Sequence, residues 1–347
     1  MALSKVDLAN QVENQLPQNL VANNLPFRNI IINGDMSIAQ RGTSSTGLTS
    51  GSTYTLDRFV TAPSNAGTWT TSQDTDVPTG QGFAKSVKLD CTTSNASLSA
   101  NSFLTFSQRI EGQNLQYLKK GTSNAESLSL SFWVKSNKTG TYICDLYDSD
   151  NTRQISKSYT IDTADTWEKK TITFSGDTTG AFDNDNGLSL FCFFWLVAGT
   201  DYTSGTLNTS WNSATTANRV VGQVNLADST SNYINFTGVQ LEAGTTASDF
   251  EFLPTDVNLQ RCQRYCYTYA NYGAGNVSGN RGYSAQYAAG SIVHIFYPTT
   301  FRAIPTLTYG EGAGSANSDQ SNISEAQLYD TDDIGFYIYD LLVEAEL

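Results

Sequence analysis

Short segments in which apolar and polar residues alternate recur along almost the whole chain. In Leu128–Val134, every second residue (Leu128, Leu130, Phe132, Val134) is apolar, which is the period of a β-strand with one buried face. Residues 167–174 and 232–242 show the same β-branched and aromatic character. Turn-forming Gly and Asn residues separate these segments, a pattern typical of antiparallel sheets and not of alternating β and α units. The sequence therefore predicts an all-β chain built on an antiparallel sandwich.

Two segments allow more specific structural predictions. Residues 136–140 resemble a turn, so Leu128–Val134 and Thr141–Tyr147 are expected to pair as a hairpin. The most apolar run, Leu188–Ala198, has about half the length that a membrane-spanning helix needs. We interpret it as a strand buried on both faces. The first residues lack the apolar core of a signal peptide.

The chain divides into three parts by composition. Residues 1–26 are rich in Gln and Asn, hold too few apolar residues for a core, and are predicted to be a segment ordered by a partner. Residues 27–255 would form the sandwich and residues 256–347 a smaller β domain. Within that smaller domain we expect a short helical turn at 259–267, strands at 291–297 and 335–343, and projecting loops at 271–282 and 310–324.

Charge excludes two classes of partner. Only 15% of the 347 residues are charged, and 33 acidic residues against 20 basic ones give a net charge of −13. A nucleic-acid groove needs a basic stripe, which the sequence lacks, and an anionic membrane surface would repel the chain. The five cysteines are scattered and odd in number, which indicates free buried thiols from a reducing cytosol.

Candidate catalytic and metal-binding residues are sparse. The single histidine, His294, lies in a strand without a sequence-local acid or nucleophile, so a satisfied structural histidine is the favoured reading. Cys262 and Cys266 lack the second pair that a zinc site requires and are expected to be half-buried thiols. Five aspartates could ligate calcium but do not form an EF-hand loop, so solvated turn acids are favoured: Asp145, Asp148, Asp150, Asp183 and Asp185. We predict no catalytic residue, metal or cofactor.

Tyrosines supply the best candidates for a recognition surface, because each ring combines an apolar body with a hydrogen-bonding tip. They crowd the start of the C-terminal part, where Tyr265 precedes the set. The residues expected to contact a glycan or protein receptor are Tyr267, Tyr269, Tyr272, Tyr283 and Tyr287. Phe and most Trp residues, including Trp133 and Trp195, are assigned to the core.

Several short stretches of sequence (phrases) resemble a bacteriophage tail-fibre family, and they follow one another in the order found in that family. The phrase at 8–12, followed by Leu16 and Pro17, is similar to N-terminal repeats of fibres that attach to a virion. Phrases resembling the family's carbohydrate-binding-module-like jelly roll span 28–36, 40–42, 54–59, 130–136, 140–142, 167–168, 172–174, 238–244, 250–251 and 260–265. The phrases at 296–305 and 343–347 resemble small C-terminal β domains of such fibres.

The resemblance implies a jelly roll, assembly as a homotrimer and a place on the virion. We therefore expect a non-enzymatic virion structural protein, made in the host cytoplasm. It would be a tail fibre that docks to a tail or adaptor protein through residues 1–26 and binds a host-surface glycan or protein through 256–347. Two alternatives stay open. One is a capsid-decoration protein, or head fibre, and the other is a glycan depolymerase with an acid pair in a groove between subunits.

Overall fold

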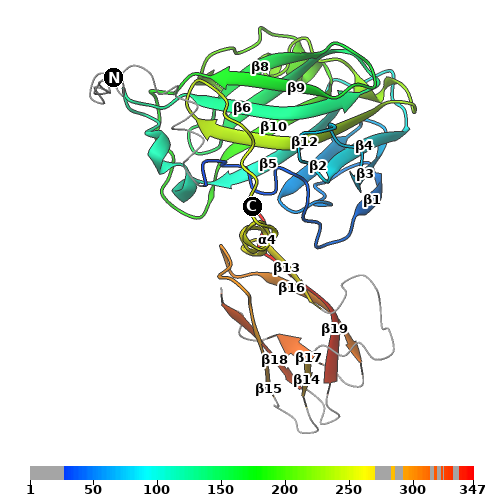
Figure 1. Ribbon diagram of the computed structural model, residues 1–347, viewed down its shortest axis with the longest axis vertical. Helices are drawn as coiled ribbons and strands as arrows, with labels where there is room; N and C mark the ends of the chain where they lie inside the picture. The colour runs from blue at the N-terminus through cyan, green and yellow to red at the C-terminus, as the bar shows by residue number, and fades with distance from the viewer. Residues whose placement is uncertain are drawn as a thin grey trace, which may run out of the picture.

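The computed structural model describes residues 27–269, 283–285, 292–312, 316–318, 322, 324–330 and 336–347. Two six-stranded antiparallel sheets pack face to face as a sandwich, drawn in the upper part of Figure 1. The first sheet has the order β1 (Ser44–Leu48), β3 (Thr68–Asp74), β4 (Ser86–Thr93), β12 (Tyr233–Ala243), β6 (Leu128–Ser136) and β9 (Glu168–Phe174). The second has the order β11 (Asn212–Ser213), β8 (Arg153–Ile161), β7 (Gly140–Asp148), β10 (Leu188–Ala198), β5 (Phe103–Glu111) and β2 (Phe59–Ser64). The all-β prediction is confirmed.

Aromatic rings fill the space between the sheets. Phe132 and Phe236 come from the first sheet and Phe106 and Phe194 from the second, and all four are buried. Phe194 lies 5.0 Å from both Phe132 and Phe236, measured between ring centroids. These rings alternate with residues on the opposite face of each strand, as the period-two pattern predicts. Burial of this apolar layer is the main force that holds the sheets together.

The predicted hairpin between 128–134 and 141–147 is wrong. β6 pairs with β9 and β12 in the first sheet, whereas β7 pairs with β8 and β10 in the second. The turn after Ser136 therefore carries the chain across the sandwich. Both strands present an apolar face, and facing each other across the core buries both of those faces.

A second group of strands lies below the sandwich in Figure 1. Its described parts are a four-stranded sheet of β13 (Cys266–Tyr269), β14 (Tyr283–Ala285), β16 (Thr306–Gly312) and β19 (Phe336–Glu344), and a three-stranded sheet of β15 (Ile292–Phe296), β17 (Ala316–Ser318) and β18 (Glu325–Asp330). Strands at 291–297 and 335–343 were expected, but part of the predicted loop at 310–324 is strand. The loop predicted at 271–282 lies outside the described residues, and the division at 255/256 stays a prediction.

Helix α4 (Thr255–Gln263) joins the two groups of strands (Figure 1). It starts four residues before the helical turn expected at 259–267, and Cys266 and Tyr267 already belong to β13. On its buried side, Cys262 packs with Ile32, Ile38 and Tyr265. Within the described residues, the other short helices are α3 (Thr200–Thr203), η1 (Gly112–Asn114), η2 (Gln116–Leu118), η3 (Thr216–Asn218) and η4 (Leu226–Asp228).

Arginines of the sandwich bind the end of the chain that follows β19. Arg41 Nε lies 2.6 Å from Glu344 and its Nη2 lies 2.8 Å from Glu346. Arg58, only 1% exposed, also pairs with Glu346 and stacks 3.4 Å above the ring of Tyr265. These contacts fix residues 344–347 against the sandwich.

Candidate functional site

The outer face of the second sheet carries a group of aromatic side chains, which we name the aromatic face: Phe103, Tyr147, Phe191, Phe193, Trp195 and Tyr202. Strand pairing explains the common side of the five rings that belong to strands, whereas Tyr202 belongs to α3, which follows β10. Tyr147 pairs with Phe191, and Trp195 pairs with Thr105 two residues along β5 from Phe103. Since residues directly opposite each other in a sheet point to the same face, these rings project together, away from the core.

The rings lie in contact and surround a hollow of about 260 Å³. Phe191 and Phe193 stack with their centroids 4.9 Å apart, and Trp195 lies 5.0 Å from Tyr202. Ser107 and Thr105 of β5 form part of the same lining. The hollow therefore offers flat apolar rings next to hydroxyl groups.

Arg219 lies over the aromatic face. Its guanidinium carbon is 5.0 Å from the ring centroids of both Tyr147 and Trp195 and 5.1 Å from that of Phe193. Contacts of this kind between a cation and ring faces are attractive. The arginine belongs to the segment between β10 and β12, so the tertiary fold brings it to these rings.

Asp145 of β7 lies beneath Arg219 and holds it in place. Arg219 Nε donates a hydrogen bond of 2.7 Å to Asp145 Oδ2. The Asp145 side chain is fully buried, and this burial raises the pKa of its carboxyl group while the charge of Arg219 opposes the rise. The pair therefore fixes one cationic group in the lining of the hollow.

Buried polar groups continue from Asp145 along β8. In the described part of the chain, Ser156 Oγ and both amide atoms of Gln154 have no hydrogen-bond partner. Ser156 pairs with Asp145 across the sheet, and Gln154 pairs with Tyr147. Native proteins leave few such groups unsatisfied, and satisfying them with a ligand or water recovers the cost of burying them. Asp145, Gln154 and Ser156 are all buried, so these polar groups lie beneath the surface beside the rings.

One part of the aromatic face is covered and another is open. Val220 and Leu207, from the segment between β10 and β12, pack with Ile143 and Trp195. Phe191 and Phe193 are only half-buried. An open row of rings flanked by a fixed guanidinium and hydroxyl groups can stack on the faces of a sugar and bond its hydroxyls.

The predicted tyrosine site is only partly described. Tyr267 is half-buried in β13, where it pairs with Val343. The backbones of Tyr269 and Tyr283 pair with Leu341 and Ile338 of the same strand, β19. Tyr272 and Tyr287 lie outside the described residues. The receptor role of these five residues therefore stays a prediction. Tyr265, which precedes the set, is buried against Arg58.

Other candidates have structural partners. His294 is exposed, and its Nδ1 lies 3.2 Å from Glu325 Oε2. Cys262 and Cys266 are fully buried, not half-buried as expected, and all five cysteines are free.

The prediction of solvated turn acids is wrong for Asp145 and Asp148. Both are fully buried and are paired with Arg219 and Lys120. Within the described residues, no group of three or more His, Cys, Asp and Glu side chains is arranged to hold a metal ion. Nor does any helix there have the length and apolarity to cross a membrane.

Sequence reasoning missed the aromatic face because Leu188–Ala198 is apolar in both registers. The prediction of a strand there is confirmed with the same bounds. One register (Leu190, Cys192, Phe194) faces the main core, whereas Phe191, Phe193 and Trp195 face outward. Trp195 is thus buried outside the main core. The available signal was that three successive positions of one register, Phe191, Phe193 and Trp195, are aromatic.

Comparisons with known proteins place the chain at a distance from solved structures. No protein-family model and no curated protein matches the sequence. Among solved structures, the enzymatically active domain of bacteriophage CBA120 tailspike protein 4 is similar, with 15% identity and a TM-score of 0.34. The match covers 63% of this chain and 22% of the tailspike chain, so the matched part of this chain spans about a fifth of that chain's length.

Two carbohydrate-binding structures are similar over nearly their whole length. TmCBM61 in complex with β-1,4-galactotriose shows 9% identity and a TM-score of 0.31, covering 62% of this chain and 99% of the module. The family 11 carbohydrate-binding module from Clostridium thermocellum, in complex with a β-1,3-1,4-mixed-linked tetrasaccharide, shows 9% identity and a TM-score of 0.30, covering 60% and 98%. These are distant likenesses of a β-sandwich.

Proposed function

We propose that this protein is a tail fibre of a phage virion, without enzymatic activity, and that its aromatic face binds a host-surface glycan. The observation that carries the binding proposal is the row of half-buried rings beside the fixed guanidinium of Arg219. Rigid aromatic side chains give a ligand contact area at little cost in side-chain entropy. The hydroxyl groups of Ser107 and Thr105 supply the polar contacts that orient a ligand.

The ordered phrases shared with the tail-fibre family support the place on the virion. On that proposal, residues 1–26 dock the fibre to a tail or adaptor protein, and three copies assemble as a homotrimer. Three equivalent sites raise the avidity for a repetitive surface, because the second and third binding events become intramolecular.

This proposal places the glycan-binding site on the sandwich, whereas the sequence predicted it at the C-terminal tyrosines. One experiment distinguishes the two locations. The full chain is applied to an array of bacterial surface polysaccharides, and the oligosaccharide that binds most strongly is titrated by calorimetry. We expect Phe191→Ala to weaken binding by about tenfold or more, as for a central aromatic contact.

Two variants serve as comparisons. Phe252→Ala removes another exposed ring, one that packs on Phe83 and Phe250 away from the aromatic face, and it should bind as the unchanged protein does. Tyr267→Ala tests the C-terminal location. If Tyr267→Ala abolishes binding while Phe191→Ala leaves it intact, the proposed site is wrong.

The same samples test the alternatives. Release of new reducing ends from the bound polysaccharide would contradict the non-enzymatic proposal and favour a depolymerase. Labelled protein found on phage heads and not on tails would favour a capsid-decoration protein.

A further inference from the structure

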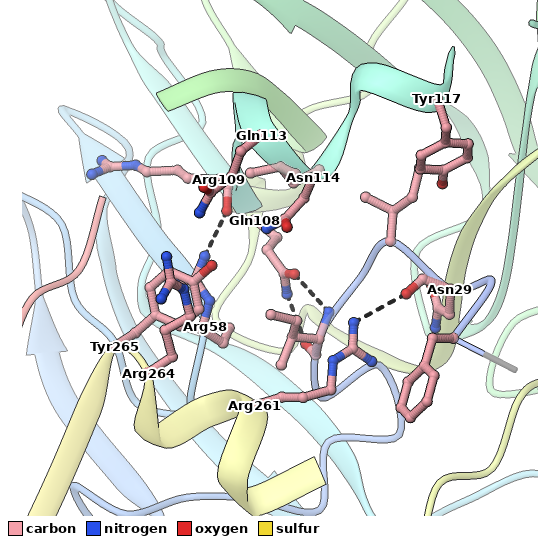
Figure 2. A pocket seen from close by; sticks show the side chains of 14 residues that line it. Asn29, Arg58, Gln108, Arg109, Gln113, Asn114, Tyr117, Arg261, Arg264 and Tyr265 are labelled. Atoms are coloured by element: carbon pink, nitrogen blue, oxygen red, sulfur yellow. Dashed lines mark hydrogen bonds between the residues drawn. The ribbon is translucent and has the colours of Figure 1, made fainter. Parts of the chain in front are cut away.

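A larger cavity lies between the sandwich and helix α4. Its volume is about 470 Å³, within the range of small-ligand sites. Figure 2 shows its lining, which comes from the segment before β1, the end of β5 with the short helices that follow it, and α4 with Tyr265. Together with Arg58, which directly precedes β2, three segments far apart in sequence therefore build its wall.

Four arginine side chains belong to the lining, and two of them already pair with a carboxylate. A third, Arg109, donates hydrogen bonds to the main-chain oxygen of Leu347 and to Ser52 Oγ. Arg264 Nε and Nη2 contact the two carboxylate oxygens of Glu111 at 3.0 and 2.8 Å. Arg58 pairs with Glu346. These two guanidinium groups are therefore neutralised within the protein.

Arg261 of α4 is different. Within the described part of the chain, its guanidinium makes one hydrogen bond, from Nη2 to the main-chain oxygen of Asn29 at 3.2 Å, and no ion pair. Burial lowers the pKa of Arg261, yet a guanidinium stays charged at neutral pH. In Figure 2 this group lies in the middle of the cavity. It is a partly desolvated cation that an incoming anion would neutralise.

The rim of the cavity is aromatic and open to solvent. Phe27 and Tyr117 are 60% and 49% exposed, and both line the cavity. In Figure 2 Asn114 lies between Tyr117 and Gln113, and both amide side chains belong to the lining. Exposed rings next to amides suit a sugar ring and its hydroxyls, whereas a small inorganic anion would leave most of this surface unused.

We propose that this cavity binds a carboxylate-bearing sugar residue, with Arg261 pairing the carboxylate and Tyr117 contacting the ring. A planar guanidinium matches a carboxylate through two parallel hydrogen bonds. The site is separate from the aromatic face and goes beyond the function proposed above, so each can fail without the other.

The test is a titration of the full chain with glucuronate at millimolar concentrations, followed by ligand-observed NMR. Glucose and inorganic phosphate are the matched probes, the first without the charge and the second without the ring. We expect saturable binding of glucuronate that is about tenfold or more tighter than that of either probe. Equal binding of phosphate would overturn the sugar assignment, and absence of saturable glucuronate binding would overturn the proposal.

Variants locate the site. Arg261→Gln should weaken glucuronate binding by about tenfold or more, and Tyr117→Ala should weaken it without changing the fold. Lys169→Gln removes one positive charge from an exposed position on β9 and controls for net charge. Circular dichroism confirms that each variant is folded. If folded Arg261→Gln binds glucuronate as the unchanged protein does, the assignment is wrong.

Phe191→Ala separates the two proposals. It should lose oligosaccharide binding at the aromatic face and keep glucuronate binding in the cavity. Loss of both in this variant would show that glucuronate occupies the aromatic face, and would overturn the cavity proposal.

Discussion

Replacing Arg219 with Gln should destabilise the protein strongly at neutral pH, because it removes the counter-charge of a buried carboxylate. Asp145 is fully buried, whereas the side chain of Arg219 is 16% exposed. Removing one partner of a buried ion pair typically costs about 3–5 kcal/mol, since the remaining charge is left uncompensated. Loss of the contacts with Tyr147, Phe193 and Trp195 adds to this cost at about 0.5–1 kcal/mol for each contact of this kind.

The opposite variant, Asp145→Asn, should cost less. The remaining guanidinium keeps its ring contacts and part of its hydration, so we expect about 1.5–3 kcal/mol, the loss of one charged hydrogen bond. The double variant should then be less destabilised than the sum of the two single variants. Urea unfolding of all four proteins, followed by tryptophan fluorescence, measures this coupling.

The pH dependence has a definite sign. Burial raises the pKa of Asp145 in the folded protein, and loss of Arg219 raises it further. The folded state then holds a proton at pH values where the unfolded chain has lost it, so lowering the pH favours the folded state. The stability difference between Arg219→Gln and the unchanged protein should therefore shrink as pH falls from 7 through the raised pKa. A loss below about 1 kcal/mol, or a difference independent of pH, would refute this reasoning.

Three further predictions concern the ion pair between Arg58 and Glu346, the close main-chain approach at Gly34, and the buried cysteine thiols. Glu346→Gln leaves the buried guanidinium of Arg58 without its counter-ion and should cost about 3–5 kcal/mol in urea unfolding. Glu126→Gln breaks an exposed ion pair with Lys119 and should cost at most about 1 kcal/mol. If Glu126→Gln and Glu346→Gln lower the free energy of unfolding equally, burial does not set the strength of these ion pairs. Gly34→Ala places a Cβ atom 2.0 Å from the main-chain oxygen of Val239, and we expect a loss of about 1–3 kcal/mol or more, with an unchanged melting temperature as the contrary result. Burial raises the pKa of Cys91 to about 11 and that of Cys192 to about 12, so a thiol reagent at pH 8 should label the five buried cysteines only after denaturation; rapid labelling of the native protein would contradict their burial.

Local sequence patterns located five of the twelve strands of the sandwich, namely β6, β7, β9, β10 and β12. Leu128, Leu130, Phe132 and Val134 all face the core, and Leu188–Ala198 forms a strand with the predicted bounds. This succeeds because side-chain direction in a strand has a period of two residues, which is a property of the backbone itself. The prediction of free, buried thiols is confirmed for Cys91, Cys144 and Cys192, whereas the burial of Cys262 and Cys266 was underestimated.

Only the tertiary structure decided which strands share a sheet and which charges meet. The turn after Ser136 serves a hairpin or a crossing between sheets equally well, and burial of two apolar faces selects the crossing. Asp145 and Arg219, separated by 74 residues, form a pair because β7 and the segment after β10 meet over the same sheet. Whether a carboxylate is solvated, and whether Phe191 faces outward, depends on neighbours that are distant in sequence. Short-range sequence patterns therefore do not predict these properties.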